Sequence, residues 1–309
     1  MSDLKTLLDQ TSRTFALAIP LLPEPTRNQV NIAYLLFRIA DTFEDAEIWP
    51  AQKRIQALSD FSRVLASPEG SDVGALARRW TEDPPVRHEG YLELLAETGQ
   101  VVAALAALPK PARDIVSAHA RCTAEGMVAV VRRGGDGRLQ LQTLEELRGY
   151  CYTVAGIVGE MLTELFLLDR PPLLPLAGYL QARSVAFGEG LQLVNILKDS
   201  EADAKDGRSY LPSLVGRGEV VDVALEDLRA AAEYSSALQR GRAERGLVAF
   251  TALPVLLARA ALRRISEAGP GAKISRAQVA AIYAGLQARL HLGLPALDEG
   301  AEAAPQPVV

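Results

Sequence analysis

The sequence predicts an all-α protein built as a helical bundle. Apolar residues recur at helical spacing along most of the chain, as in the segment 51–66, where Leu58, Phe61 and Leu65 share one face. We find no convincing strand pattern, internal repeat or interior linker. With 309 residues, the chain is long enough to bury a large core. We therefore expect a single domain over residues 1–292 and a disordered tail over residues 293–309.

Composition and charge exclude several classes of protein. Hydrophobic residues make up 49% of the chain and its mean hydropathy is +0.07, which is typical of a soluble globular protein. A net charge of −5 and a pI near 5.4 argue against nucleic acid as a partner. The longest apolar stretch, Leu247 to Ala258, contains Pro254 and is too short to span a bilayer. Because charged residues also interrupt the N-terminal segment, we expect neither a signal peptide nor a transmembrane anchor.

The cysteines and histidines indicate no zinc or redox site. Cys122 and Cys151 are the only cysteines and have no metal-binding or redox spacing, so a reducing compartment is the simple inference. His88, His119 and His291 are scattered along the chain. We therefore expect a cytoplasmic protein, which, if it handles a lipid, can still contact the inner face of a membrane peripherally.

The stretch YLLFRIADTFED carries the first candidate site. Read as a helix, it places Tyr34, Arg38, Asp41 and Asp45 on one continuous face, surrounded by apolar residues that predict burial. Two carboxylates four residues apart repel each other and are costly to remove from water. A solvated acidic patch is the ordinary alternative, but these flanks favour a polar cavity or a bound cation.

A second stripe of the same kind lies in GLQLVNILKDSEAD. Gln192, Asn195, Asp199 and Asp203 share one helical face, again with apolar neighbours. Hard oxygen ligands of this kind suit Mg²⁺. The two stripes predict two buried acidic helices that face each other across a cavity.

A long predicted helix between the two stripes contains two glycines, which are unfavourable inside a helix. Thr143 and Glu146 form a capping box that opens a helix running through Leu168. Gly156 and Gly159 inside it each cost roughly 1 kcal/mol relative to alanine. Either a neighbouring helix or a substrate chain must approach closely there.

These features together indicate the chemistry of a diphosphate ester. Mg²⁺ held by carboxylates keeps waters and binds phosphate oxygens. Basic side chains could neutralise the remaining charge of a diphosphate, and the candidates are Arg13, Arg38, Lys198 and Arg208. An apolar bundle beside such a site suits a diphosphate that carries a long hydrocarbon. Its metal-assisted ionisation would give an allylic carbocation, which apolar walls protect from water.

Several motifs in the same order resemble the squalene and phytoene synthase family. They are QTSRTFALAIPLLPEPTRNQV, YLLFRIADTFED, YCYTVAG, GLQLVNILKD and GRSYLP, and they cover nearly the whole chain except the tail and residues 67–88. The resemblance implies an isoprenoid-synthase-type bundle with a central cavity. QTSRTF, DTFED, AFTALP at 249–254 and GAKIS at 271–275 are most similar to the squalene synthase branch. That branch implies head-to-head condensation of two farnesyl diphosphates to presqualene diphosphate, followed by NADPH-dependent reduction to squalene.

The resemblance also implies roles for individual residues. The metal ligands would be Asp41, Glu44, Asp45, Asn195, Asp199 and Asp203. The catalytic side chains would be Tyr34, Arg38, Tyr150 and Phe250, where Tyr150 acts in the first half-reaction and the ring of Phe250 borders a cation. The substrate-binding residues would be Ser12, Arg13, Phe15, Gln192, Lys198, Arg208 and Tyr210. NADPH or phosphate contacts would come from Arg13, Arg38, Lys198 and Lys273.

Three positions depart from the family pattern. Ala202 stands where the second metal motif usually has a carboxylate, and Glu201 is displaced by one position, about 100° around a helix. Lys198 replaces an arginine and loses bidentate geometry. Ser275 replaces a basic residue near Lys273. The first two departures concern metal and diphosphate binding, and the third concerns NADPH.

Three functions therefore stay open at this point. The first is squalene synthesis. The second is an enzyme that stops at presqualene diphosphate, or that makes dehydrosqualene or phytoene without NADPH. The third, indicated by Ala202, is a protein that binds prenyl diphosphates without turning them over. A purely structural bundle would not need two acidic faces.

Overall fold

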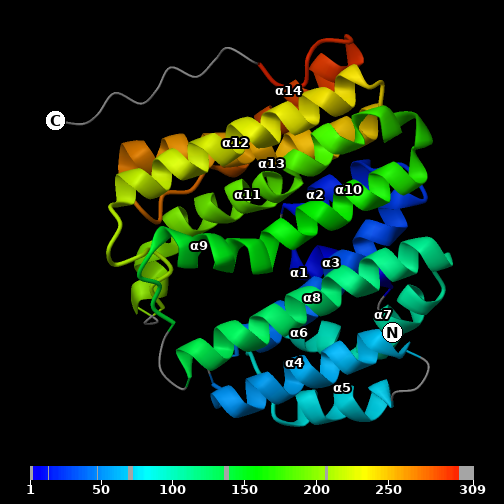
Figure 1. The fold of residues 1–309 in the computed structure, drawn as a ribbon, viewed down its shortest axis with the longest axis vertical. Coiled ribbons are helices and arrows are strands. Elements are labelled where there is room, and N and C mark those ends of the chain that lie inside the picture. Colours follow the sequence, from blue (N-terminus) through cyan, green and yellow to red (C-terminus); the bar gives the residue numbers. More distant parts are fainter. Residues whose placement is uncertain are drawn as a thin grey trace. The chain divides into compact units, whose positions relative to one another are not determined.

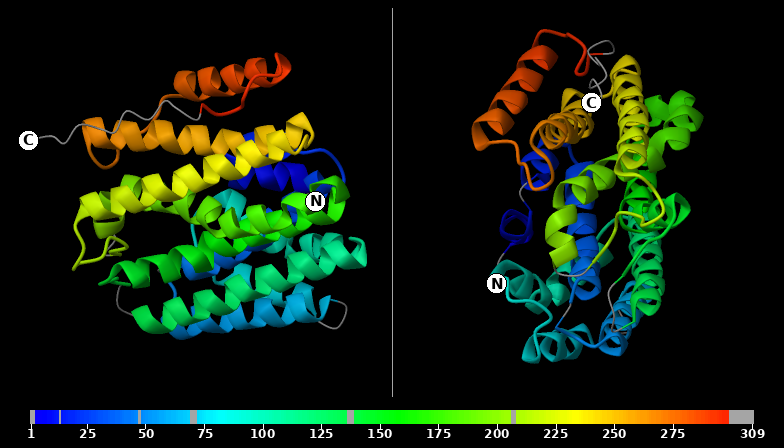
Figure 2. Two further views of the ribbon diagram at one scale, coloured as in Figure 1. Left: turned by 45° about the horizontal axis from the view of Figure 1, so that its top comes forward. Right: turned by 90° about the vertical axis from the view of Figure 1, so that its left-hand side faces the viewer.

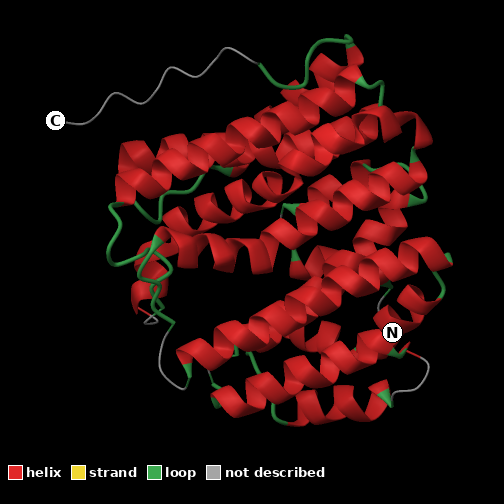
Figure 3. Ribbon diagram, viewed as in Figure 1, coloured by secondary structure: helices red, strands yellow, loops and turns green. Residues whose placement is uncertain are grey.

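The protein is all-α, as its sequence predicts. The computed structural model describes residues 3–12, 14–46, 48–68, 72–135, 139–205 and 208–298. All the elements along these residues are helices (Figure 3). Within the same residues, extended backbone pairs only at an isolated parallel bridge between Gln140 and Ser209. The predicted helix over residues 51–66 is confirmed as α4, Ala51–Ala66.

The chain divides into two compact units, where the sequence led us to expect one domain. Unit 1 comprises Met1–Pro20, Glu24–Leu139 and Glu164–Asp169. Unit 2 comprises Leu21–Pro23, Gln140–Thr163 and Arg170–Val309. Figure 1 gives the order of the helices along the chain. Each acidic stripe belongs to one unit, the first to unit 1 and the second to unit 2.

Helix α3 is the central helix of unit 1. Its apolar side chains, among them Leu35, Leu36 and Ile39, are fully buried and pack against α1, α4, α7 and α8. The helices that begin in this unit are α1 Leu4–Thr11, α2 Phe15–Ala18, η1 Ile19–Leu21, α3 Thr26–Glu44, α4 Ala51–Ala66, α5 Val73–Glu82, α6 Glu89–Ala96, α7 Thr98–Ala106 and α8 Lys110–Gly134.

An aromatic cluster fixes the C-terminal end of α3. The ring of Phe43 lies 4.7 Å from Trp80, 6.1 Å from Trp49 and 6.3 Å from Phe61. The indole N–H of Trp49 donates to the carbonyl of Asp83 at 3.0 Å. Because Phe43 lies between Asp41 and Glu44 in the sequence, this packing holds the first acidic motif on a rigid support.

Helix α11 has the corresponding place in unit 2. It packs along α12 and also contacts α13 and the π-helical turn η3 (Figure 2). Helix α14 lies at the edge of the unit, against α13. The remaining helices are α9 Leu144–Cys151, η3 Tyr152–Gly156, α10 Ile157–Asp169, η4 Pro171–Leu176, α11 Ala177–Lys205, α12 Arg217–Arg240, α13 Arg245–Ala268 and α14 Arg276–His291.

The glycines near η3 are required by a neighbouring helix. A Cβ built on Gly159 would collide with the carbonyl oxygen of Ser184, and one built on Gly188 would collide with that of Ala155. The backbones of the two helical segments therefore touch, which only glycine permits. The structure thus accounts for Gly159 by helix packing, the simpler of the two explanations. The capping box of Thr143 and Glu146 at the start of α9 is confirmed.

The C-terminal segment differs from the expected disordered tail over residues 293–298. Ala296 and Leu297 are buried, and Arg289 donates to the carbonyl oxygen of Pro295 at 2.7 Å. Local hydrogen bonds and apolar burial thus anchor a stretch that composition alone described as tail. Residues 299–309 lie outside the described part of the chain.

Two helical stretches are long and apolar enough to cross a membrane by length and composition. They are Leu144–Asp169 and Arg245–Ala268, and 56% and 67% of their most apolar windows are buried inside the protein. Such burial is typical of core helices, so these stretches are weak evidence for a membrane span.

Candidate active site

The stripe on α3 combines a buried helix with partly accessible polar groups. Tyr34, Arg38 and Asp41 are half-buried and Asp45 is exposed, whereas their apolar neighbours are buried. The guanidinium of Arg38 lies 3.3 Å from the carboxylate of Asp41. The same guanidinium lies 5.7 Å from the centre of the Tyr34 ring.

The electrostatics of this stripe are strongly perturbed. Burial raises the pKa of Asp41 to about 6, while Arg38 opposes the rise and Asp45 adds to it. Burial alone would lower the pKa of Arg38, but Asp41 and the neighbouring tyrosines raise it overall. The carboxylate of Asp41 is therefore short of compensating positive charge, which a bound cation would supply.

The residues that precede α3 complete this part of the site. The hydroxyl of Ser12 accepts the backbone N–H of Phe15 at 3.0 Å, and the ring of Phe15 lies 5.6 Å from that of Tyr34. Tyr34 donates its hydroxyl to the carbonyl of Thr11 at 2.8 Å. Arg13 lies outside the described residues, so its predicted substrate and cofactor contacts stay predictions.

Sequence reasoning missed Tyr91, a second aromatic partner of Arg38. The Tyr91 ring on α6 lies 5.5 Å from the Arg38 guanidinium. No helical spacing connects the two positions. A weak signal existed in Gly90, where a Cβ would come within 2.9 Å of the carbonyl of Gln10 on α1. This close approach brings α6 to the stripe.

The carboxylates of the first motif do not all point the same way. Glu44 is 6% exposed, and Arg54 donates to its backbone carbonyl, whereas Asp45 caps the helix and is exposed. Within the described residues, no group of three or more His, Cys, Asp or Glu side chains is placed to share a metal ion. A pair of Asp residues four apart nevertheless fits Mg²⁺, because this ion commonly takes one or two carboxylates together with water and phosphate oxygens.

The second stripe is more open than we expected. Asn195 is exposed and Asp199 and Asp203 are partly exposed, whereas their apolar neighbours are buried as predicted. Leu193 and Leu197 of the same helix are fully buried, and the polar stripe keeps access to solvent. Lys198 donates to the Asn195 side chain at 3.0 Å and lies 3.2 Å from the Asp199 carboxylate. The ammonium group of Lys198 thus contacts both the Asn195 amide and the Asp199 carboxylate.

An aromatic and basic group lies beyond the C-terminal end of α11. Arg208 donates its backbone N–H to the carbonyl of Asp203 at 2.7 Å, and its guanidinium lies 6.0 Å from the Tyr210 ring. Tyr210 stacks on Tyr150 of α9, with ring centres 4.7 Å apart. The structure therefore brings Tyr150 of one sequence motif next to Tyr210 and Arg208 of another.

A charged cluster holds the helix that carries Tyr150. Arg148 binds Glu189 of α11 at 2.5 Å and the carboxylate of Asp227 of α12 in a bidentate manner, at 2.8 and 3.2 Å. Burial raises the pKa of both carboxylates, and Arg148 opposes the rise. One arginine thus ties three helices of unit 2 together and fixes the register of α9.

The other predicted residues of unit 2 are more dispersed. Lys273 is exposed, in a loop that Gly271 attaches to α11 by donating to the carbonyl of Lys198 at 2.8 Å. Gln192 is half-buried on α11, and Phe250 is 1% exposed within α13. Ser275 has a structural function, because its hydroxyl accepts the backbone N–H of Gln278 in a capping box that opens α14.

Comparison with known proteins identifies the family. Residues 8–217 match the family described as squalene/phytoene synthase. The squalene synthase of Schizosaccharomyces pombe is 34% identical over 211 residues, which are 67% of this chain and 43% of that protein. The squalene synthase of Mycosarcoma maydis is 32% identical over 215 residues, which are 69% of this chain and 35% of that protein. The chain belongs to the squalene/phytoene synthase family.

Solved structures of squalene/phytoene synthase relatives share the fold. The structure described as the complex of TcSQS with the ligand E5700 has a TM-score of 0.78 at 25% identity, and the match covers 94% of this chain and 87% of that one. A dehydrosqualene synthase in complex with a ligand has a TM-score of 0.59 at 20% identity. The expected all-α isoprenoid synthase fold is therefore confirmed. The chain spans less than half the length of the two fungal relatives, and Phe250 and Lys273 lie beyond the residues of the family match.

Proposed function

We propose that this protein condenses two farnesyl diphosphates head to head, with Mg²⁺, to presqualene diphosphate and reduces that product with NADPH to squalene. The observation that carries the proposal is the stripe on α3, in which Asp41 lies beside Arg38 with a pKa raised to about 6. Burial of the Asp41 carboxylate costs free energy. Such a cost is typical of a site that binds a cation together with an anionic ligand. Membership of the family and the similarity to squalene synthases support the reaction class.

The side chains of unit 1 bind the substrate's charged end. Asp41 and Asp45 supply carboxylate oxygens for Mg²⁺, which when bound stabilises the departing pyrophosphate. Arg38 offers guanidinium N–H groups to phosphate oxygens and is held in place by Asp41 and the rings of Tyr34 and Tyr91. The aromatic faces favour positive charge, whether on Arg38 or on a nearby carbocation.

The side chains of unit 2 provide a second acidic motif and an aromatic pair. Asp199 and Asp203, with Asn195, supply oxygen ligands for Mg²⁺, while Lys198 and Arg208 neutralise diphosphate charge. The stacked rings of Tyr150 and Tyr210 present a phenol and an aromatic face to the first half-reaction. Phe250, buried in α13, contributes an aromatic face to the later cation.

NADPH use is supported by Lys273, and one observation favours a second candidate function. The loop that carries Lys273 is attached to α11 and leaves its ammonium exposed for a phosphate group. Ser275, however, caps α14 with its side chain and offers no positive charge. An enzyme that ends at presqualene diphosphate, or at an unreduced hydrocarbon such as dehydrosqualene or phytoene, is therefore the alternative function.

The physical nature of the product suggests where the reaction takes place. A hydrocarbon of this size leaves water for a bilayer, since each buried methylene contributes about 0.8 kcal/mol. We therefore include a peripheral contact with a membrane surface in the proposed function.

Product analysis tests the proposal directly. The purified protein is incubated with farnesyl diphosphate and Mg²⁺, with and without NADPH, and its products are separated by chromatography. We expect squalene only in the presence of NADPH. The matched controls are incubation with a chelator, which should give no product, and the Asp41→Asn variant, which should form product far more slowly.

Other outcomes distinguish the alternatives. Presqualene diphosphate or an unreduced hydrocarbon in both incubations would establish the second function. No product from farnesyl or geranylgeranyl diphosphate, together with saturable binding of either, would establish a binding protein without turnover.

A further inference from the structure

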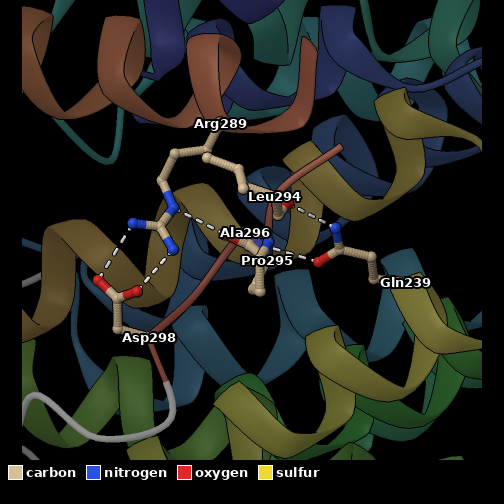
Figure 4. Close-up of polar contacts among 6 residues, drawn as sticks. All are labelled: Gln239, Arg289, Leu294, Pro295, Ala296 and Asp298. Carbon is tan, nitrogen blue, oxygen red and sulfur yellow. Dashed lines mark hydrogen bonds and ion pairs between the residues drawn. The ribbon is translucent and has the colours of Figure 1, made fainter. Parts of the chain in front are cut away.

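The C-terminal end of α12 is flanked by two anchored segments of unit 2. On one side, Gln239 donates its amide to the carbonyl of Leu294 and accepts the backbone N–H of Ala296, both at 2.8 Å (Figure 4). Arg289 binds Asp298 at 2.5 and 3.2 Å and so closes this segment over the end of the helix. The positions of residues 294–298 are thus set by hydrogen bonds from α12 and α14.

On the other side, η4 is attached to the same end of α12. Arg170 binds Glu244 in the turn between α12 and α13 at 2.5 Å. Gly241 ends α12, and a Cβ there would lie 3.3 Å from the Leu173 side chain. The segment PPLLPL is therefore fixed by packing and by an ion pair, and its three prolines stiffen it further.

Leucines on both segments point into solvent. Leu174, Leu292 and Leu294 are 57%, 71% and 46% exposed, although their neighbours Leu173 and Leu297 are buried. A flexible segment could turn such side chains inward, but these backbones are held by the contacts above. Several large apolar side chains held outward at one end of a unit indicate an interaction surface.

The described residues at this end include exposed arginines, in a protein whose net charge is −5. Arg242 and Arg245 are both exposed. Among the described residues of η4, of the turn 241–244 and of the segment 292–298, the carboxylates are Glu244 and Asp298, and each is bound by an arginine, Arg170 or Arg289. The end of α12 therefore combines exposed leucines with an excess of exposed arginines.

We propose that five residues, Leu174, Leu292, Leu294, Arg242 and Arg245, dock the protein on a bilayer that carries anionic headgroups. We name them the Leu/Arg surface. The leucines enter the boundary between headgroups and acyl chains, and the arginines bind lipid phosphates. Charge argues against a second copy as the occupant, because a two-fold interface would bring the same positive patches together. The inference extends the membrane contact of the proposed function by naming its surface and its lipid class.

Vesicle flotation with the full chain tests this surface. Vesicles of phosphatidylcholine with phosphatidylglycerol are compared with vesicles of phosphatidylcholine alone, without substrate or Mg²⁺. We expect binding to the anionic vesicles and a loss of binding as salt is raised. Arg242→Gln with Arg245→Gln should weaken partitioning by about fivefold per arginine, and Leu292→Ser with Leu294→Ser by roughly fivefold per leucine.

Matched controls keep the test specific. Leu214→Ser removes a leucine that is 76% exposed elsewhere in unit 2, and Arg263→Gln with Arg276→Gln removes two exposed arginines at the opposite ends of α13 and α14. These controls should bind vesicles like the parent, and circular dichroism should show the same helix content for every variant.

Three outcomes would overturn the inference. They are no retention on anionic vesicles, equal losses in the control variants, and a dimer that Leu292→Ser with Leu294→Ser converts to a monomer while vesicle binding is absent. Condensing activity is measured separately in detergent solution. Failure of vesicle binding therefore leaves the proposed reaction intact, and loss of the reaction leaves the Leu/Arg surface testable.

Discussion

The two acidic motifs have similar spacing but very different surroundings. On α3, Asp41 is 30% exposed and paired with Arg38, Glu44 is buried, and a cluster of aromatic rings supports the helix from behind. On α11, Asp199 is 42% exposed and shares Lys198 with an exposed Asn195. The first motif thus combines a buried Glu44 and a partly buried Asp41 with an exposed Asp45, whereas Asp199 and Asn195 of the second motif keep more contact with water.

This difference shows what residue spacing can and cannot determine. Spacing decides which side chains share a helical face, but the packing of neighbouring elements decides how much water they keep. A desolvated carboxylate beside an arginine is prepared for a charged ligand before the ligand arrives. An exposed motif must be ordered by its ligand, and its affinity depends on how many oxygens it supplies.

Replacing one aspartate in each motif should give the largest effect on activity and should distinguish the two motifs by their response to Mg²⁺. We expect Asp41→Asn and Asp199→Asn each to lower kcat/KM by about 10²–10³-fold, because each removes an oxygen that we propose as a ligand of Mg²⁺. High Mg²⁺ should partly restore the Asp199 variant but not the Asp41 variant, in which a prearranged ligand is lost. Product formation from farnesyl diphosphate, measured as Mg²⁺ is varied, checks this difference.

The thermal midpoint provides a second readout for the same variants. Asp41→Asn should leave Tm unchanged or raise it, since burial disfavours the ionised carboxylate that is removed. Asp9→Asn on α1 and Asp222→Asn on α12, both exposed, are the matched controls and should retain full activity. Near-normal activity in both the Asp41 and Asp199 variants would refute the metal assignment.

The charged cluster in unit 2 should have the largest effect on stability. Arg148→Met leaves Glu189 and Asp227, each only 5% exposed at the side chain, without their shared cation. We expect a loss of about 2–4 kcal/mol in the free energy of unfolding, towards the low end because Arg148 is itself partly exposed. Urea denaturation measures the loss.

The sign of the pH dependence tests the cause. Burial already raises the pKa of both carboxylates, so without Arg148 they favour the protonated form further. Protonation relieves the unpaired charge, and the deficit of the Arg148→Met variant should therefore shrink as pH falls. Arg183→Met, which breaks the more exposed pair with Glu233, is the control and should cost no more than about 1 kcal/mol. Equal losses in the two variants would contradict a special contribution from the buried cluster.

Adding a carboxylate to the open motif should strengthen it. Ala202 is exposed on α11 between Asp199 and Asp203, so Ala202→Glu supplies another oxygen without displacing a packed side chain. We expect Mg²⁺ affinity to rise roughly tenfold, or about 1.4 kcal/mol, as measured by calorimetric titration. Ala182→Glu, at an exposed position earlier on α11, is the control and should change nothing. Unchanged affinity in the Ala202 variant would mean that the native motif does not lack a ligand.

Local pattern was sufficient for much of the fold. The helix over residues 51–66 and the capping box of Thr143 and Glu146 follow from residues within a few positions of each other, and both are confirmed. The polar stripe on α3 also follows from spacing alone. The π-helical turn over Tyr152–Gly156 does not, because it accommodates the close contact between two segments distant in sequence.

The missed features of the site all depend on long-range contacts. Tyr91 reaches Arg38 only because α6 packs near α3, and Arg148 meets its two carboxylates from separate helices. Exposure of the second stripe likewise depends on which face of α11 packs against the core of its unit. The relation between the two motifs, and the roles of the residues in catalysis, stay predictions.

The smallest expected effect is a change in stability caused by a substitution in the core against which α11 packs. Tyr234 on α12 is buried against Phe187 of α11, and its hydroxyl shares a hydrogen bond with Thr163 at 2.8 Å. Burial raises the pKa of this phenol above its ordinary value of 10.0, despite the opposing hydrogen bond. Above pH 10 the unfolded chain therefore loses the proton first, so stability falls as pH rises.

Tyr234→Phe should lower stability by about 1 kcal/mol at neutral pH, where it loses the hydrogen bond, but should reduce the loss of stability at alkaline pH. Tyr179→Phe, at an exposed position, is the control, and urea denaturation from neutral pH to above pH 10 compares the three proteins. Parallel alkaline losses in the parent and the Tyr234 variant would show that another buried group controls this transition.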